Sequence, residues 1–313
     1  MTTFNRRQTL ATMGAAAAVG LAAPAVAQGK KITLGALRFT SHSGTFVAYQ
    51  REYFKQAGLD VELKFFQAAQ PMAVAIASGD VDYAVTAISG GLVSLADKGA
   101  IKVIGGALSE EKGIDGQKFL ASDAAYQAGV TAPAMMDGKS LGMTTAGASF
   151  HYMGSQMARA EGIELSFKPL QKVGAIIGAL KTGQIDGWSI VPHIAKPLAS
   201  SGAVHIIGNV SDYLPDYQVT TVFTSTKNAR EEKQQTQDYL AAYAKGAADY
   251  NAAMIEQTAG AEGVAEMVKL IHKYVYADKP YEKAEKSIRN GAMRINKNLR
   301  FNMESVHAHL RWM

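Results

Sequence analysis

An internal duplication constrains the fold of this chain more than any other feature. Two segments, residues 31–85 and 140–190, repeat the same order of β-rich runs, helical patterns and closing glycines. The similar phrases Ala77-Ser78-Gly79-Asp80-Val81-Asp82 and Lys181-Thr182-Gly183-Gln184-Ile185-Asp186 fall at the same place in both copies. The apolar periodicity predicts strands over 31–37, 59–65, 81–85, 140–144, 163–167 and 185–190, and helices over 46–56, 71–77, 150–160 and 173–181. Each copy is therefore a βαβαβ unit.

Two such units predict an α/β protein of two lobes, each a mostly parallel sheet flanked by helices. We expect residues 118–122 to lead out of the first lobe and 217–223 to return to it, so that lobe 1 comprises 28–118 plus 222–313 and lobe 2 comprises 119–221. Helices predicted over 259–275, 281–289 and 303–312 should pack on lobe 1. Ligands of such sheets bind beyond the carboxyl ends of the strands, at helix N-termini. The fold therefore predicts a ligand cleft between the lobes.

Residues 1–27 have the pattern of a cleavable export signal. Arg6 and Arg7 precede an uncharged, Ala- and Gly-rich run, and Ala25-Val26-Ala27 offers the small-x-small pattern of a cleavage site. The Arg pair followed by Leu10 favours the twin-arginine (Tat) route over the Sec route, although Thr9 stands where Phe is usual. We expect a periplasmic product that is free in solution and carries no lipid, because the chain has 0 cysteines.

Composition excludes several classes of protein. The missing cysteines remove disulfide frameworks, zinc ribbons, iron–sulfur clusters and thiol nucleophiles. The net charge is only +5, two of which come from Arg6 and Arg7, so we expect no nucleic-acid surface.

The common enzyme motifs are missing as well. Gly138-Lys139-Ser140 has Pro133 where a P-loop needs glycine, no G-x-S-x-G elbow occurs, and His307 and His309 lie on different helix faces. We therefore predict no catalysis, no cofactor and no metal.

Candidate ligand contacts follow strands or precede helices at the mouth of the predicted cleft. They are Arg38, Thr40, Ser41, His42, Gln67, Gln70, Thr86 and Ser89 in lobe 1, and Thr145, Gly147, Ser149, His151, Val173, Gly174, Trp188 and His193 in lobe 2. Small residues let backbone N–H groups approach an oxyanion, and hydroxyls add donors. A Ser or Thr at these positions also suits an N-cap, and Trp188 at a strand end also suits the core.

The leader, the duplicated lobes and the C-terminal helices together resemble the solute-binding proteins of ABC importers, which have the type II periplasmic binding fold. The resemblance is to the branch that binds nitrate, taurine, aliphatic sulfonates and thiamine-precursor pyrimidines. It rests on residues 52–62, 75–82, 137–143 and 179–186. It implies a monomer that closes on one small solute and presents it to a membrane-embedded permease with its ATPase. The family often has a Glu-Pro pair after the last strand, where this chain has Val191-Pro192-His193.

The identity of the ligand stays open at this point. Arg38, the small-residue loops and the mild positive charge favour a small anion such as a sulfonate, nitrate or organic acid. The alternative is a neutral aromatic or pyrimidine compound that stacks on Trp188. The resemblance also allows a pyrimidine-precursor synthase, which the missing cysteines disfavour, and a sensory role in signalling.

Overall fold

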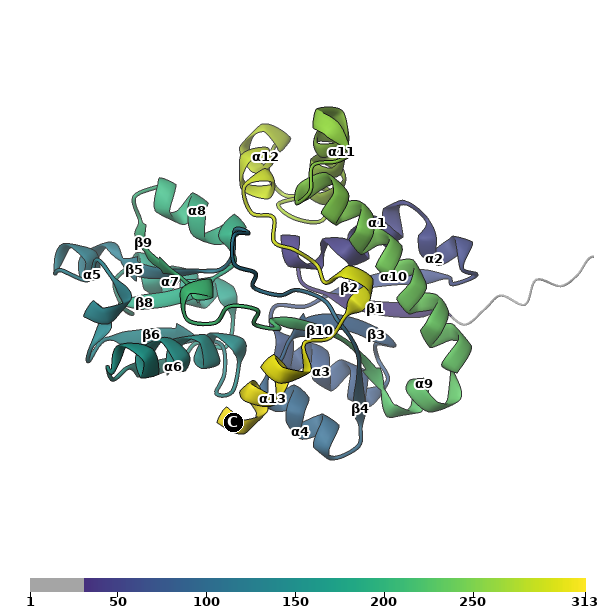
Figure 1. Ribbon diagram of the computed structural model, residues 1–313, viewed down its shortest axis with the longest axis horizontal. Coiled ribbons are helices and arrows are strands. Elements are labelled where there is room, and N and C mark those ends of the chain that lie inside the picture. The colour runs from purple at the N-terminus through teal and green to yellow at the C-terminus, as the bar shows by residue number, and fades with distance from the viewer. Residues whose placement is uncertain (1–30) are drawn as a thin grey trace, which may run out of the picture. The chain divides into compact units, whose positions relative to one another are not determined.

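The computed structural model describes residues 31–313, and the export signal predicted over residues 1–27 lies outside the described residues. Two five-stranded sheets form the framework of this part of the chain (Figure 1). The first sheet has the order β2-β1-β3-β10-β4, and the second has the order β7-β6-β8-β5-β9. Their strands are β1 (Ile32–Ala36), β2 (Val61–Phe65), β3 (Tyr83–Ala87), β4 (Ile101–Gly106), β5 (Lys118–Ser122), β6 (Ser140–Met143), β7 (Ser166–Pro169), β8 (Gly187–Ile190), β9 (Val204–Asn209) and β10 (Thr220–Ser225).

The two sheets have the same topology, which confirms the duplication predicted from the sequence. β1 is parallel to β2 and β3, and β6 is parallel to β7 and β8. In each sheet the fourth strand is antiparallel to both of its neighbours, β3 and β4 in the first sheet and β8 and β9 in the second. This fourth strand is β10 in the first sheet and β5 in the second. The α/β fold class is therefore as predicted.

Helices flank both sheets. They are α1 (Ser43–Gln50), α2 (Tyr53–Gln56), α3 (Ala69–Ser78), α4 (Gly90–Asp97), α5 (Asp123–Gln127), α6 (Ser149–Glu161), α7 (Val173–Lys181), α8 (Pro192–Ser200), α9 (Thr226–Glu231), α10 (Lys233–Met254), α11 (Gly260–His272), α12 (Tyr281–Arg289) and α13 (Met303–Trp312). Short 3-10 turns lie at Thr40–His42, Pro133–Met136, Val210–Asp212 and Lys297–Leu299. Of the helices from Ser43 onward, none is long and apolar enough to span a membrane.

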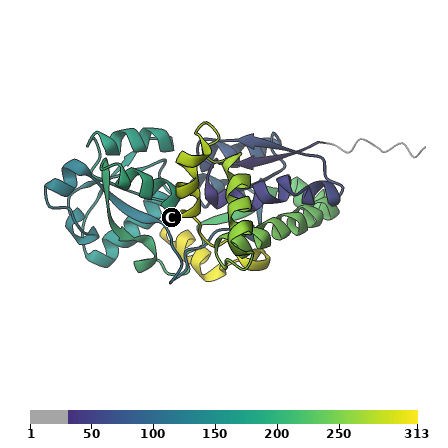
Figure 2. The ribbon, with the colours of Figure 1, turned by 90° about the horizontal axis from the view of Figure 1, so that it is seen from above.

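Two helix predictions need correction. The single helix predicted over 46–56 is interrupted, because Glu52 adopts a left-handed conformation with φ 57° between α1 and α2. The C-terminal helices do not all pack on the first half of the chain. α10 and α11 pack on α1, α12 packs on α11 but also on α8, and the aromatic ring of Trp312 packs on Tyr152 of α6. Figure 2 shows these yellow C-terminal elements next to the teal elements of the second half.

Two linkers join the halves built on the two sheets. The first linker, residues 107–117, runs from β4 to β5, and the second linker, residues 210–219, runs from β9 to β10. The linkers pair with each other, because the Glu110 N–H donates to the Tyr217 carbonyl and the Val219 N–H donates to the Leu108 carbonyl, both at 2.9 Å. The boundaries of the two lobes predicted from the sequence remain a proposal.

Candidate functional site

A small cavity of about 50 Å³ lies where the carboxyl ends of the parallel strands of both sheets meet. Its apolar wall consists of Leu37, Phe39, Ala68, Ala69, Ala87, Leu108, Ala148, Phe150, Val173, Ile190, Val191 and Val219. Its polar wall consists of Ser41, His42, Thr86, Gln117, Thr144, Ser149 and Thr220. Among the described residues, no Asp, Glu, Lys or Arg lines this cavity.

Several helices begin at the cavity wall without a capping side chain, and α3, α6 and α7 are among them. The N-caps of α3, α6 and α7 are Ala68, Ala148 and Lys172, and none of the three forms a side-chain cap hydrogen bond within the described residues. By contrast α4, which starts outside the cavity wall, is capped by Ser89, whose hydroxyl accepts the Leu92 N–H at 3.3 Å. The N–H groups of the first two residues of α3, α6 and α7 are therefore left to donate to a ligand, and the positive ends of the helix dipoles favour a negative one.

His42 and Thr86 add polar groups to the same wall. The Nδ1 atom of His42 accepts the Leu37 N–H at 3.4 Å, which assigns the ring proton to Nε2. Burial lowers the pKa of His42 to about 3, so the imidazole is neutral at pH 7. The Thr86 hydroxyl is buried and has no hydrogen-bond partner within residues 31–313. Both groups are free to bond a solute.

Thr40 and His193 join the two halves beside the cavity rather than in its wall. The Thr40 hydroxyl lies 2.9 Å from His193 Nδ1 and donates to the Gly291 carbonyl at 3.1 Å. Because the hydroxyl has one proton to give, His193 Nδ1 must donate to Thr40. Burial, with His42 nearby, lowers the pKa of His193 to about 3. This neutral pair positions the loop that carries Ser41 and His42.

Gly90 and Gly147 form a second contact between the halves. The Gly90 N–H donates to the Gly147 carbonyl at 3.0 Å, which joins α4 to the loop before α6. His151 Nδ1 accepts the Gly147 N–H at 3.1 Å, and its ring packs on those of Phe167 and Trp312. His151 therefore supports the loop, and burial lowers its pKa.

Two candidate residues that were central to the ligand prediction lie outside the cavity wall. Arg38 is exposed, donates to the Tyr274 carbonyl at 3.1 Å and stacks its guanidinium 3.8 Å above the Phe65 ring. Trp188 is fully buried in the core, in a T-shaped contact with Phe150, which itself lines the cavity.

The other candidates divide in the same way. Ser41, His42, Thr86, Ser149 and Val173 lie in the wall. Gln67 and Gly174 are exposed, Gln70 packs over Gly91, and the Thr145 carbonyl accepts the Ala148 N–H at 3.2 Å.

Three further polar residues of the wall, Gln117, Thr144 and Thr220, were not among the candidates predicted from the sequence. Gln117 and Thr220 adjoin the two linkers, at the starts of the crossing strands β5 and β10. The signal for Gln117 and Thr220 was their position at those predicted crossings, and the signal for Thr144 was its position at the end of the predicted strand 140–144. Among the described residues, no group of three or more His, Asp or Glu side chains could hold a metal ion.

Comparison with known proteins agrees with this architecture. The model of the family described as NMT1/THI5 like matches residues 39–253. Among curated proteins, no sequence matches the chain.

Solved structures share the fold at low sequence identity. The alkanesulfonate-binding protein SsuA from Xanthomonas axonopodis pv. citri, bound to MOPS, is 14% identical with a TM-score of 0.69, over 90% of both chains. The periplasmic nitrate-binding protein NrtA from Synechocystis PCC 6803 is 14% identical with a TM-score of 0.67, over 88% of this chain and 74% of that one. The Candida albicans CA3427 gene product, described as having the generic periplasmic binding protein fold, is 15% identical with a TM-score of 0.67, over 86% and 83%. Residues 31–313 therefore have the periplasmic binding protein fold.

Proposed function

This chain belongs to the NMT1/THI5-like family, and from that premise we propose that it is the solute-binding component of an ABC importer, selective for a small anion. The observation that carries the proposal is the convergence of the uncapped N-termini of α3, α6 and α7 on one cavity between the two sheets. Structures of similar fold include proteins named for alkanesulfonate and nitrate, which are both monoanions.

The cavity favours a singly charged and small solute. Helix N-termini, the His42 N–H and hydroxyls supply donors, while no cationic side chain among the described residues stands in the wall to balance a second negative charge. Since one water molecule needs about 10–15 Å³ of such space, about 50 Å³ suits a solute of few non-hydrogen atoms. The cavity can therefore bind an anion without Arg38, which lies outside its wall.

The alternative ligand class and the alternative function have less support. A neutral aromatic or pyrimidine ligand was favoured by Trp188 as a stacking face, but that ring lies in the core. We propose that the chain is not a pyrimidine-precursor synthase, because it has 0 cysteines. In the same proposal the protein is a periplasmic monomer, exported by its leader, that delivers the solute to a permease with its ATPase.

Titration calorimetry against nitrate, short carboxylates and short sulfonates tests the ligand class. We expect saturable binding of at least one monoanion, which at 100 times its Kd raises the free energy of unfolding by about 2.7 kcal/mol. Binding of neutral heterocycles alone would reject the anion class. Turnover of a bound compound by the purified protein would reject the assignment as a binding protein.

A further inference from the structure

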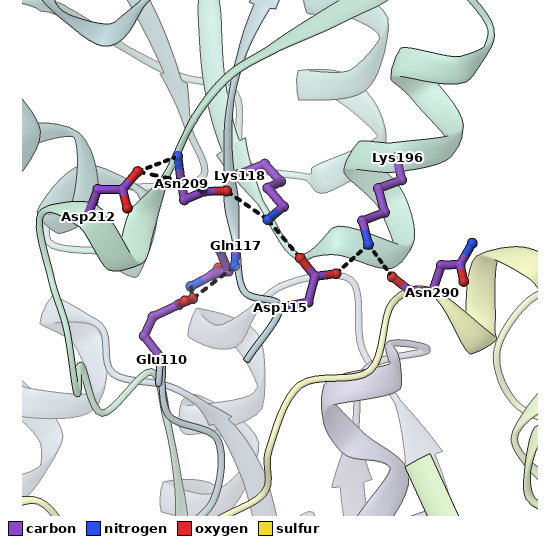
Figure 3. Close-up of polar contacts among 8 residues, drawn as sticks. All are labelled: Glu110, Asp115, Gln117, Lys118, Lys196, Asn209, Asp212 and Asn290. Carbon is purple, nitrogen blue, oxygen red and sulfur yellow. Dashed lines mark hydrogen bonds and ion pairs between the residues drawn. The ribbon is translucent and has the colours of Figure 1, made fainter. Parts of the chain in front are cut away.

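A buried carboxyl–amide pair stands behind the cavity wall. Glu110 and Gln117 lie at opposite ends of one loop in the first linker, and both side chains are almost fully buried (Figure 3). The Gln117 backbone N–H and its side-chain Nε2 both donate to Glu110 Oε1, at 3.0 and 3.1 Å. Nε2 also lies 3.2 Å from the sulfur of Met153.

This pairing sets the orientation of the Gln117 amide. Glu110 Oε1 already accepts the Gln117 backbone N–H, so a proton on this carboxyl group would be on Oε2 and Oε1 can only accept. The side-chain nitrogen of Gln117 must therefore face Oε1. The amide oxygen is thereby turned away from Glu110, and within residues 31–313 the hydrogen bonds of this side chain are those of its nitrogen to Glu110 and Met153. Because Gln117 is part of the cavity wall, we infer that this oxygen is presented to the cavity.

The surrounding contacts hold the pair in this arrangement. Glu110 Oε2 packs against Gly116, where an added Cβ would lie only 2.0 Å away, and the Glu110 N–H is fixed to the second linker. The next residue, Lys118, bonds Asp115 at 2.7 Å and Asn209 at 2.8 Å, and Asp115 is also paired with Lys196 (Figure 3). Gln117 therefore lies between anchored neighbours and has little freedom to turn its amide over.

We propose that Gln117 determines specificity by accepting a hydrogen bond from the ligand. This rests on the proposed function and narrows it: the preferred solute carries an N–H or O–H donor in addition to its anionic group. Donors on the helix N-termini would hold the oxyanion, and the amide oxygen of Gln117 would select the substituent. A solute without a donor would leave this acceptor desolvated and unpaired, which costs binding free energy.

Calorimetry with matched ligands tests the proposal. The pairs are acetate against glycolate and ethanesulfonate against 2-hydroxyethanesulfonate, and 2-aminoethanesulfonate distinguishes an ammonium donor from a hydroxyl. We expect the donor-bearing member to bind about tenfold more tightly to the wild-type protein. Gln117→Met keeps the length of the side chain but removes the acceptor. It should bring the ratio of the two affinities close to one without lowering the affinity for the donor-free ligand.

Two further variants complete the test. Glu110→Met removes the acceptor that orients the amide and should reduce the ratio, which makes Glu110 a positioning residue. Gln127→Met, on the exposed face of α5, should leave the ratio unchanged. Equal affinities within each pair for the wild-type protein would overturn the role of Gln117, even if Gln117→Met fails to fold. If no member of the panel binds, the proposed anion class fails first and this inference fails with it.

Discussion

Gly147 shows how a single residue can determine whether the two halves meet. It has a left-handed φ of 71°, and a Cβ added to it would lie 3.0 Å from the Cα of Gly90 and 3.1 Å from its nitrogen. An L-residue at this position therefore meets two obstacles, backbone strain and a clash across the contact between the halves.

We expect Gly147→Ala to weaken ligand binding at least about tenfold, because the added methyl group opposes the contact with Gly90. Gly162→Ala is the matched control, since Gly162 has a φ of 68° but open space around its Cβ position. Both variants should melt at similarly lowered temperatures, while calorimetry should show the loss of affinity in Gly147→Ala alone. Equal affinities in the two variants would show that the contact is dispensable.

The buried carboxyl group of Glu110 should make the stability of the protein depend on pH. Burial raises its pKa from 4.5 to about 7, so the folded protein retains a proton that the unfolded chain has already released. The contribution of this group to stability therefore falls as the pH rises from 4.5 to 7.

Glu110→Gln cannot titrate, so its free energy of unfolding should rise relative to that of the wild-type protein across this window, by up to roughly 3 kcal/mol. Denaturant unfolding at several pH values measures the difference. The exposed Glu266→Gln serves as the control. A difference that stays constant with pH, or falls, contradicts the raised pKa.

At the residue scale, sequence alone located part of the candidate site. Loops of small residues after strands marked Ser41, Thr86 and Ser149, because a strand end leading into a helix requires such residues whatever the ligand. Gln117 and Glu110 could not be found in this way, because their roles depend on a pairing across the linker and on burial that no local pattern encodes.

At the scale of elements, helix starts are the functional units of this fold. α6 illustrates this, because its first turn contributes Ser149 and Phe150 to the cavity wall and its N-cap, Ala148, has an extended backbone with φ −71° and ψ 161°. That conformation is also the one preferred before proline.

Ser149→Pro should therefore keep α6 intact, since proline is well tolerated at the first helical position, while removing one N–H donor. We expect about tenfold or greater loss of affinity for the anion, because a hydrogen bond to a charged group is lost. Ser149→Ala removes the hydroxyl but keeps the N–H and separates the two contributions. Unchanged affinity in Ser149→Pro would argue against binding at this helix start.

Most elements within the duplicated segments were predictable, and so were β5, α12 and α13 outside them, whose observed bounds match the predicted 118–122, 281–289 and 303–312. The pattern gave α7 with its observed bounds and the parallel strands within a few residues. The strands β4 and β9 and the helices α4 and α8 were missed. β4 and β9 are edge strands. β4 pairs only with β10 and β9 pairs only with β5, and in both pairs the partner strand is distant in sequence.

At the scale of the whole molecule, α13 links parts of the chain that a hinge would separate. The Ser305 hydroxyl accepts the Gln218 N–H of the second linker at 2.8 Å, while Trp312 lies 5.2 Å from the Tyr152 ring of the second half. α13 thus joins a linker to the second half, and we expect movement of one half relative to the other to change its surroundings.

The chain has 2 tryptophans, so Trp188→Phe leaves Trp312 as the sole indole. We expect a saturable change in its fluorescence when the anion binds, because closure alters the contacts of α13. Trp312→Phe, which retains only the buried Trp188, should respond much less. A larger response from Trp188 would place the change in the core of the second half.

The strand order has a consequence for how the polypeptide matures. Every strand of the second sheet lies within one continuous stretch, 118–209, whereas the first sheet needs β10 between β3 and β4. While the ribosome is still translating the middle of the message, β4 has no hydrogen-bonded neighbour, and its backbone groups stay unpaired until residues 220–225 emerge. The half that begins first is thus completed last, and a nascent chain interrupted before that point would expose an unfinished sheet to chaperones and proteases.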